Sequence, residues 1–376
     1  MSDDFVTRLE HQLSEAERLL ERGSRASRVR ARTRVWRPAR AQLLGFAVSA
    51  AAAVAVVVGA VALTRGSHER PTPLSRPHVV ARLSTGAVFD MTTGFGQVWI
   101  NSSDHDQVLR VDPTSRRIVA RIPAGRDPSG IATAAGAVWV IAHAGDPSGA
   151  AYTLSRIDPA SNRVTRIGLP GPASALLGPS GLPHLRANGS VLWVVGEAGG
   201  VRIDPRRGAV TGLARWGLGD GAIANGYGLT GNDLWVHAAD GRLLRLDART
   251  GTRRATLSTP ANSRLAAVSG QAVILLGNDG TVTRVDPTTG RSLWRARLSS
   301  APAGDSIGRN LAIAGTTLWA VRENTFQDTE RLTAIDLASG RILGSTPLQD
   351  LGADWLTVVG DQLWYARAPQ TIALEP

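Results

Sequence analysis

Seven charged or histidine side chains lie a few residues after a Trp-containing segment that recurs along the chain, and they are the first candidates for a functional role. They are His105, His143, Glu197, Asp240, Asp279, Glu323 and Arg367. Proteins commonly bind ligands with imidazole, carboxylate and guanidinium groups that are carried by converging loops. We therefore predict that these seven residues line a polar ligand-binding face. The alternative is that they are solvated loop residues without a ligand.

Known catalytic motifs are missing from this sequence. There is no P-loop, no GxSxG segment, no HExxH segment and no dinucleotide-binding glycine motif. The seven histidines are scattered, and no pair has the spacing of metal ligands on one strand or helix. Because the chain has no cysteine, thiolate zinc sites, iron–sulfur clusters and cysteine nucleophiles are excluded. We predict no catalytic residue, no metal and no cofactor, and therefore a protein that is not an enzyme.

The net charge of +11 at pH 7 raises the question of a nucleic-acid partner. The distribution of charge argues against one. Residues 1–76 carry 13 Arg against 7 acidic residues, and residues 77–376 carry 29 Arg against 24 acidic residues. The excess in the longer part is that of an ordinary solvated surface. We therefore expect no nucleic acid as a partner.

The recurring segment is a short apolar run centred on Trp, and it predicts the fold. Its seven copies are 38 to 54 residues apart and are centred on Trp99, Trp139, Trp193, Trp235, Val273, Trp319 and Trp364. This period suits the four-stranded blades of a β-propeller. We expect the Trp side chains to pack between neighbouring blades, where large rigid rings fill the space.

A second landmark, an Asp that ends a β-like run, follows each of the first six copies. The six residues are Asp112, Asp158, Asp204, Asp247, Asp286 and Asp336. Several copies continue to a glycine, at Gly208, Gly251, Gly290 and Gly340. Asp accepts hydrogen bonds from backbone N–H groups two residues later, and Gly supplies the positive φ that closes a tight turn. Each unit is therefore an inner strand, a Trp strand, an Asp strand and an outer strand.

The two ends of the repeat region complement each other. Residues 78–83 resemble the outer strand of a unit but precede the first complete unit, and the last unit, from about Asp354, ends without an outer strand. Since no unit buries its apolar face alone, the units must stack. The N-terminal strand fills the vacancy of the last unit. The prediction is an all-β fold, a seven-bladed β-propeller over residues 77–376.

The repeats resemble a known family. The segment from Val108 to Trp139 is similar to the YVTN (YncE-like) repeat of bacterial propellers, and residues 280–294 are similar to the repeat of quinoprotein-type propellers. The resemblance covers residues 77–376 and specifies fold more than function. It implies two enzymatic alternatives. Streptogramin lyases resemble this repeat and use a histidine, acidic groups and magnesium, for which His105 and His143 are the candidates. Quinoprotein enzymes use a quinone, calcium and commonly a vicinal Cys pair, which is absent here.

Residues 41–64 contain no charged side chain, and Leu43 to Leu63 are almost entirely Leu, Val, Ala, Gly and Phe. A helix of this length spans the hydrocarbon core of a bilayer. We predict a transmembrane helix over 41–64. The rival interpretation is a signal peptide cleaved after Ala62, since Ala60-Val61-Ala62 has the small-x-small form of a cleavage site.

Ten Arg lie between Arg8 and Arg40, and few follow the apolar segment. The positive-inside rule places the N-terminus in the cytoplasm. We therefore predict a plasma-membrane protein with an Arg-rich cytoplasmic head (1–40), a linker (65–76) and an extracytoplasmic propeller. Apolar residues from Phe5 to Leu20 recur at helical spacing, which predicts an amphipathic helix on the lipid surface or a docking helix for a partner.

One insertion distinguishes the units, a Pro- and Gly-rich excursion over residues 168–188 whose role the sequence leaves open. Taken together, the sequence predicts a single-pass membrane protein that presents a non-catalytic propeller for binding an extracytoplasmic ligand or protein, with a possible sensing role. The alternatives are a transmembrane regulator that acts through the head, in the manner of an anti-sigma factor, and a lyase or quinoprotein-type enzyme that uses the channel face.

Overall fold

The computed structural model describes residues 72–73, 77–144, 152–178, 182–218, 224–298, 311–324, 329–348 and 355–375. The chain divides into two units, residues 1–68 and 69–376, and all described residues belong to the second. The predicted head (1–40) and transmembrane helix (41–64) lie outside the described residues, as does most of the linker. Among the residues that are described, no helix is long and apolar enough to cross a membrane.

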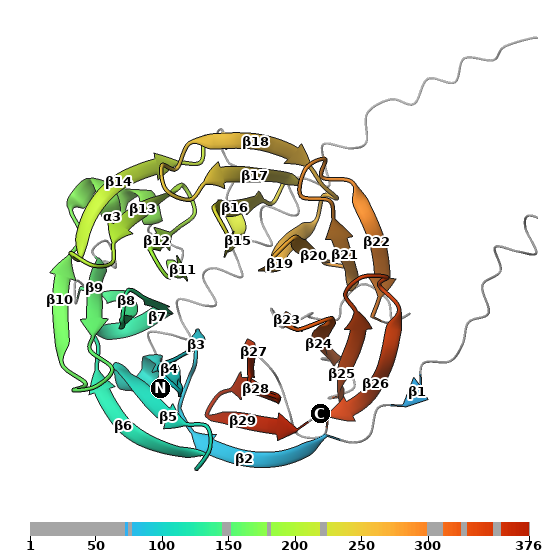
Figure 1. The fold of residues 1–376 in the computed structure, drawn as a ribbon, viewed down its shortest axis with the longest axis horizontal. Helices are drawn as coiled ribbons and strands as arrows, with labels where there is room; N and C mark the ends of the chain where they lie inside the picture. The colour runs from blue at the N-terminus through green and yellow to red at the C-terminus, as the bar shows by residue number, and fades with distance from the viewer. Residues whose placement is uncertain are drawn as a thin grey trace, which may run out of the picture. The chain divides into compact units, whose positions relative to one another are not determined.

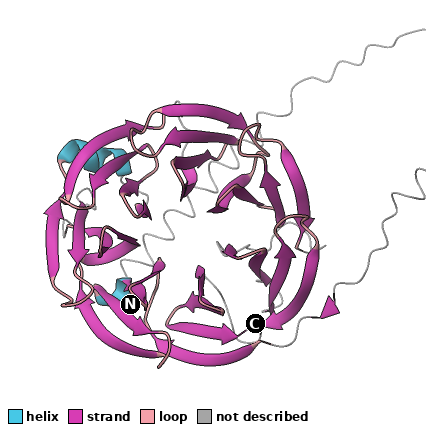
Figure 2. Ribbon diagram, viewed as in Figure 1, coloured by secondary structure: helices cyan, strands magenta, loops and turns pink. Residues whose placement is uncertain are grey.

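The second unit is a ring of seven antiparallel sheets, each built from an innermost to an outermost strand (Figure 1). Strands form almost all of its regular structure (Figure 2). The predicted seven-bladed β-propeller is confirmed. In each blade the recurring Trp or Val273 segment is the second strand, and in blades 1 to 6 the Asp landmark ends the third strand or follows it directly.

The first three blades follow one another directly in the chain. Blade 1 consists of β3 (Met91–Gly94), β4 (Gln97–Ser102), β5 (Gln107–Asp112) and β6 (Arg117–Pro123), with a 3-10 helix, η1 (Ser103–His105), after β4. Blade 2 consists of β7 (Arg126–Ala134), β8 (Ala137–His143), β9 (Tyr152–Ile157) and β10 (Val164–Gly168). Blade 3 consists of β11 (His184–Asn188), β12 (Val191–Val195), β13 (Gly199–Asp204) and β14 (Ala209–Arg215).

The next three blades repeat this order. Blade 4 consists of β15 (Ala224–Thr230), β16 (Asp233–Ala238), β17 (Arg242–Asp247) and β18 (Arg253–Ser258). Blade 5 consists of β19 (Ser263–Ser269), β20 (Ala272–Gly277), β21 (Thr281–Val285) and β22 (Ser292–Arg297). Blade 6 consists of β23 (Leu311–Ala314), β24 (Thr317–Asn324), β25 (Thr329–Asp336) and β26 (Ile342–Leu348).

Blade 7 joins the two ends of the ring. It consists of β27 (Trp355–Val359), β28 (Gln362–Arg367), β29 (Gln370–Glu375) and, from the beginning of the propeller, β2 (His78–Ser84). Strand β2 is antiparallel to β29, with Arg82 opposite Ile372 and Ser84 opposite Gln370. The prediction that the N-terminal strand completes the last blade is therefore confirmed.

A short additional strand lies on the outer edge of blade 6. Strand β1 (Thr72–Pro73) pairs in parallel with β26, with Thr72 opposite Gly344. Both residues belong to the predicted linker (65–76). An outer strand leaves one row of backbone groups unpaired, which is the reason a neighbouring segment can add to it.

The Asp turns have the predicted chemistry. Asp112 Oδ1 accepts hydrogen bonds from the backbone N–H groups of Thr114 and Ser115 at 2.8 and 3.0 Å. The same pair of contacts recurs two and three residues after Asp158, Asp204, Asp247 and Asp286. The turn glycines have positive φ, from 67° at Gly208 to 77° at Gly251. The third strand of a blade also shifts register against the fourth just before the turn in blades 1, 3, 4, 5 and 6.

The core lies between the blades, as predicted from the Trp repeat. Trp99, Trp139, Trp193, Trp235 and Trp364 are buried, whereas Trp319 is partly buried. The Trp364 ring packs with Val98 and Ile100 of blade 1 across the closure of the ring. Large apolar surfaces are thus removed from water only when neighbouring blades meet, which makes stacking a condition of stability.

The insertion between blades 2 and 3 contains a helix, α3 (Gly171–Leu177), that no sequence pattern predicted. Ala173, Leu176 and Leu177 are buried. The helix packs against the turn between β12 and β13, where a Cβ at Gly196 would lie 2.4 Å from the Leu177 Cα atom. Glycine at position 196 therefore allows the helix to approach the loop that carries Glu197.

Candidate functional site

The central channel opens into a polar cavity of about 550 Å³. We call it the channel mouth. It is formed by the first residues of the inner strands β11, β15, β19 and β27 together with the second loops of blades 3 and 5. Its lining residues with polar or aromatic side chains are His184, Arg186, Glu197, Asn225, Tyr227, Arg264, Asn278 and Trp355.

Arg186 of β11 is the best-defined cation of the mouth. Its Nε atom donates to the Tyr227 carbonyl at 3.0 Å, and Nη1 donates to the Leu185 carbonyl at 2.7 Å. Nη1 also lies 3.9 Å from Oδ2 of Asp90. The side chain is 27% exposed. The guanidinium is therefore fixed by three contacts and still reaches the cavity.

Asp90 is the buried counter-ion of this arginine. It lies just before β3, and its Oδ1 accepts the Met91 N–H at 2.9 Å while Oδ2 accepts the Ile131 N–H at 3.4 Å. Burial raises the pKa of the Asp90 carboxyl to about 6, although Arg186 and the two backbone N–H groups act in the opposite direction. One carboxylate thus connects blades 1, 2 and 3 at the channel.

Glu197 is held by the turn between β12 and β13. The Trp216 indole N–H donates to the Gly196 carbonyl at 2.7 Å, and the Ala224 N–H donates to the Glu197 carbonyl at 3.3 Å. The Glu197 carboxylate lies against Gly178, which follows α3. It raises the pKa of Tyr152 and of Tyr227, in both cases as a smaller contribution than burial. The insertion and two blades therefore fix one carboxylate at the mouth.

Three rings from three blades line the mouth. The His184 ring centroid lies 6.0 Å from that of Tyr227 and 6.2 Å from that of Trp355, with the planes tilted by 47° and 60°. Such tilted contacts are favourable for aromatic rings and leave their edges and faces available to a further ring or apolar group. The mouth thus combines two guanidiniums, one carboxylate and an aromatic cluster.

His237 lies behind the lining and positions Asn225. Asn225 donates from Nδ2 to the Ser263 carbonyl at 2.9 Å, so its Oδ1 faces His237 Nδ1 at 2.8 Å as an acceptor. His237 Nδ1 therefore carries the proton, and Nε2 lies 3.0 Å from the Thr259 hydroxyl, which also contacts the Gly241 carbonyl at 2.8 Å. Burial lowers the pKa of His237 to about 4. The neutral ring is part of the structure near pH 7.

The channel continues beyond the mouth. A second hollow, of about 400 Å³, shares Arg186, Tyr227 and Ala266 with the mouth. Its apolar lining comes from four blades and consists of Leu229, Ala267, Val268, Leu311, Ala312, Ile313, Leu356 and Val358. A ligand that entered the channel would meet the charged groups of the mouth first and, deeper inside, a hollow whose surface is more polar than apolar.

Of the seven residues predicted as a binding face, Glu197 lines the channel mouth. Asp279 lines a neighbouring hollow of about 490 Å³ that shares Asn278 with the mouth. The Asp279 carboxylate accepts the Thr281 N–H and hydroxyl at 3.0 and 2.8 Å, which lowers its pKa. Asp240 is paired with Arg242 at 2.6 Å, and the hydrogen bonds from Arg242 lower its pKa.

The two predicted histidines lie on neighbouring blades but in different surroundings. His105 Nδ1 lies 2.8 Å from Asp104 Oδ1 and 3.0 Å from the Ser102 hydroxyl, and its side chain is 56% exposed. His143 Nε2 lies 3.8 Å from Asp127 Oδ2, and its ring centroid is 5.1 Å from that of Tyr152. Among the described residues, no group of three or more His, Cys, Asp or Glu could hold a metal ion.

The side chains of Glu323 and Arg367 lie outside what the structure describes, although both residues belong to described strands, β24 and β28. The sequence pattern places the predicted site residues in loops. The prediction therefore does not include Arg186, Tyr227, Arg264 and Trp355, which are in inner strands. The sequence does contain a signal for these residues. In strands that face a narrow channel, small apolar residues are expected, so a charged or large aromatic residue near the beginning of such a strand is an exception that indicates a site.

The fold and the repeat define the protein as a seven-bladed β-propeller with PQQ-type repeats. Residues 179–375 match the family described as outer membrane protein assembly factor BamB, and since this is more than half of the chain, the chain belongs to that family. The matched region begins in the insertion and contains blades 3 to 7 except for β2. Among curated proteins, none matches the sequence.

Two solved structures show the same fold at low sequence identity. The β-propeller domain of Cps50 (Swd1) from Myceliophteria thermophila is 10% identical with a TM-score of 0.59, over 80% of this chain and 100% of that one. The computationally designed Ika8 protein is 12% identical with a TM-score of 0.52, over 77% of this chain and 96% of that one. At these identities the likeness concerns the fold alone.

Proposed function

We propose that this protein is a non-catalytic binding propeller, anchored in the membrane by residues 41–64 with the propeller on the extracytoplasmic side, and that its ligand enters the channel mouth. The single observation that supports this most is the cavity of about 550 Å³ at the mouth of the channel. Its size is in the range of small-molecule sites. A family named for an assembly factor rather than for a reaction supports a binding role.

The chemistry of the channel favours an organic carboxylate with an apolar or aromatic body. Arg186 and Arg264 present guanidinium groups at the mouth, and guanidiniums match carboxylates in geometry and charge. The rings of His184, Tyr227 and Trp355 suit an aromatic or apolar body beside that carboxylate. The second hollow, which contains Leu229, Val268 and Ile313 among mostly polar surface, has room for the rest of the body. The C-terminal residues of a peptide are one source of such a group.

A matched pair of probes tests the ligand class. The full-length protein in detergent is titrated with Ala-Leu-Phe that carries a fluorescent dye on its N-terminal amine, first with a free C-terminal carboxylate and then as the amide, and binding is followed by fluorescence anisotropy. We expect the carboxylate to bind at least tenfold more tightly. The variant Arg264→Gln should abolish this preference and Trp355→Leu should weaken the binding of both probes, whereas Arg117→Gln on the exposed outer strand β6 should leave both affinities unchanged. Equal affinity for the two probes, or no binding of either, contradicts the proposal.

The membrane part rests on the sequence of residues 41–64 and on the excess of Arg before them. Membranes of a bacterial host that expresses the full-length chain are extracted with alkaline carbonate, and intact spheroplasts are then treated with a protease. We expect the chain to stay in the pellet and the propeller to be digested from outside while residues 1–40 stay protected. Release into the soluble fraction, or cleavage at Ala62, would show that the segment is not a retained anchor.

A further inference from the structure

The third strand of blades 1 to 5 carries an Arg two residues before the Asp landmark, and in blades 1 and 4 this Arg has a side-chain acceptor at the start of the Trp strand of its own blade. In blade 1, Arg110 Nε donates to Gln97 Oε1 at 3.3 Å, and Nη1 reaches the Pro159 carbonyl of blade 2 at 2.7 Å. In blade 4, Arg245 donates to Asp233 Oδ2 at 2.7 Å. Gln97 and Asp233 stand at the same position, two residues before the Trp. Blades 1 and 4 thus pair this guanidinium internally.

Blade 3 lacks this acceptor, as does blade 2, which has Ala137 at the same position. The residue two before Trp193 is Val191, which has no acceptor for Arg202. The carbonyl of Ala248 in the next blade, which corresponds to the Pro159 carbonyl, is occupied by the Trp193 indole N–H at 2.7 Å. Arg202 turns instead to the Thr211 carbonyl of its own outer strand, at 2.9 Å. Its charge therefore has no internal partner of the kind that Arg245 has.

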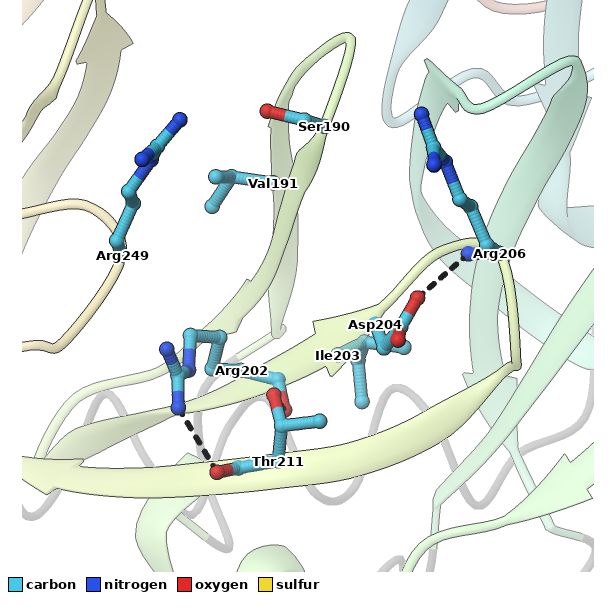
Figure 3. Close-up of a pocket in the computed structure, with 8 residues that line it drawn as sticks. All are labelled: Ser190, Val191, Arg202, Ile203, Asp204, Arg206, Thr211 and Arg249. Carbon is cyan, nitrogen blue, oxygen red and sulfur yellow. Dashed lines mark hydrogen bonds between the residues drawn. The ribbon is translucent and has the colours of Figure 1, made fainter.

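The result is a hollow of about 550 Å³ between blades 3 and 4, on the side of the Asp turns. Figure 3 shows Arg202 and Arg249 on one side of it and Arg206 on the other, with Ser190 and Val191 between Arg249 and Arg206. The three arginines come from β13 and from the turns after β13 and β17. In the described part of the chain, none of the three forms an ion pair with an acidic side chain.

The remaining charged groups around the hollow are already paired. Asp204 accepts the backbone N–H groups of Arg206 and Arg207, and these bonds lower its pKa. Arg207 lies 3.7 Å from the same carboxylate. Arg254 of blade 4 is paired with Asp233 and Asp247. The unpaired positive charge is therefore confined to the three arginines that line the hollow.

We propose that this hollow, which we call the arginine pocket, binds a phosphoryl group. Three guanidiniums suit a tetrahedral anion that carries two negative charges and several acceptor oxygens better than they suit a single carboxylate. The Ser190 hydroxyl at the rim is a further donor. The pocket opens at the opposite end of the blades from the channel mouth, so the two sites take ligands independently and the inference does not depend on the proposed function.

Pyrophosphate and inorganic phosphate are the probes, with the full-length protein in detergent and isothermal titration calorimetry as the measurement. We expect pyrophosphate to bind with a dissociation constant below 1 mM by order of magnitude, and citrate to bind at least tenfold more weakly. Arg249→Gln removes a guanidinium at an exposed turn and should weaken pyrophosphate binding at least fivefold. Arg117→Gln, which removes the same charge from an outer strand, should leave the affinity unchanged.

The variant Val191→Asp is the sharper test, because it gives Arg202 the internal acceptor that Asp233 gives Arg245. It should fold, as blade 4 does with the same residue, and lose pyrophosphate binding. Vesicles of phosphatidylglycerol, compared with phosphatidylcholine, then distinguish a lipid headgroup from a free phosphate compound as the source. Failure of pyrophosphate and of anionic vesicles to bind, or equal binding by wild type and Val191→Asp, overturns the proposal.

Discussion

The Arg186 guanidinium of blade 3 lies 3.9 Å from the Asp90 carboxylate of blade 1, across the inner edge of blade 2. The Asp90 side chain is 10% exposed, whereas that of Arg186 is 27% exposed. The carboxylate of the pair is therefore largely shielded from solvent, whereas the guanidinium is partly exposed. Asp90 anchors the guanidinium from within, and Arg186 presents the remaining donors to the channel mouth. A buried carboxylate of this kind makes the site sensitive to pH.

Asp90→Asn should change how stability depends on pH. The pKa of Asp90 is about 6 in the folded protein, above its ordinary value of 3.8. Between these pH values the folded state holds more protons than the unfolded state, so this residue makes the free energy of unfolding fall as the pH rises from about 4 to 6. Relative to wild type, the Asn variant should gain up to about 3 kcal/mol over this range. Urea unfolding at pH 4, 5, 6 and 7 measures the difference. A constant difference across the series would contradict the buried position of Asp90.

His237→Gln should show the opposite trend. The pKa of His237 is about 4 in the folded protein and 6.5 ordinarily, so the unfolded state binds more protons between these values. The contribution of His237 to the free energy of unfolding is therefore complete above pH 6.5 and is lost as the pH falls towards 4, by up to about 3 kcal/mol. The advantage of wild type over the variant should shrink in acid.

Urea unfolding of wild type and His237→Gln at pH 4, 5, 6 and 7 measures this advantage. An advantage of the same size at every pH would mean that the His237 ring is not buried as the structure has it.

The fold was predictable because its signals are local and repeated. Each Asp turn needs only a few neighbouring residues, and the Trp of each second strand recurs at a period that few folds share. The closure by residues 78–83 followed from counting strands at both ends. The helix α3 was not predictable, because seven residues with Pro and Gly carry no helical periodicity, and its burial depends on Gly196 of a distant loop.

The closure of the ring can be tested with a disulfide, because the chain has no cysteine of its own. Ser84 and Gln370 are directly opposite each other on β2 and β29. The double variant Ser84→Cys, Gln370→Cys should form an intramolecular disulfide on oxidation and gain roughly 4 kcal/mol in unfolding free energy. Mobility on non-reducing gels and urea unfolding are the measurements. Ser84→Cys with Asp361→Cys, at the start of β28, should not cross-link; cross-linking of both pairs to the same extent would refute the register.

Two glycine substitutions distinguish the cost of backbone strain from the cost of disturbed packing in the free energy of unfolding. Gly340 has φ of 74°, and a Cβ there would lie 2.6 Å from Trp294 Cδ2, whereas Gly270 has φ of 56° with no atom within 4 Å of such a Cβ. Both Ala substitutions should lose about 1–2 kcal/mol for the left-handed backbone. Gly340→Ala should lose a further 1–3 kcal/mol, by order of magnitude, because the ring must move. Equal losses in thermal unfolding would mean that the turn of blade 6 does not pack on Trp294.

The site was less predictable than the fold, for a physical reason. Loop residues such as Glu197 are recognisable because they follow a strand signal, but the direction of a side chain in an inner strand depends on the register of that strand within the ring. Arg186 and Arg264 reach the channel through that register. Histidines such as His105 and His143 looked suitable because of their chemistry, yet each is already paired with a neighbouring carboxylate, Asp104 and Asp127.

The most direct test of the central claim is photo-crosslinking from inside the channel in intact cells. The photo-reactive amino acid p-benzoylphenylalanine replaces Trp355 in one full-length variant and Val119, which is 52% exposed on the outer strand β6, in another. After irradiation the protein is purified and its adducts are identified by mass spectrometry. The account predicts a carboxylate-bearing adduct at position 355 that is absent at position 119. No adduct at 355, or the same adducts at both positions, would contradict a ligand site in the channel mouth.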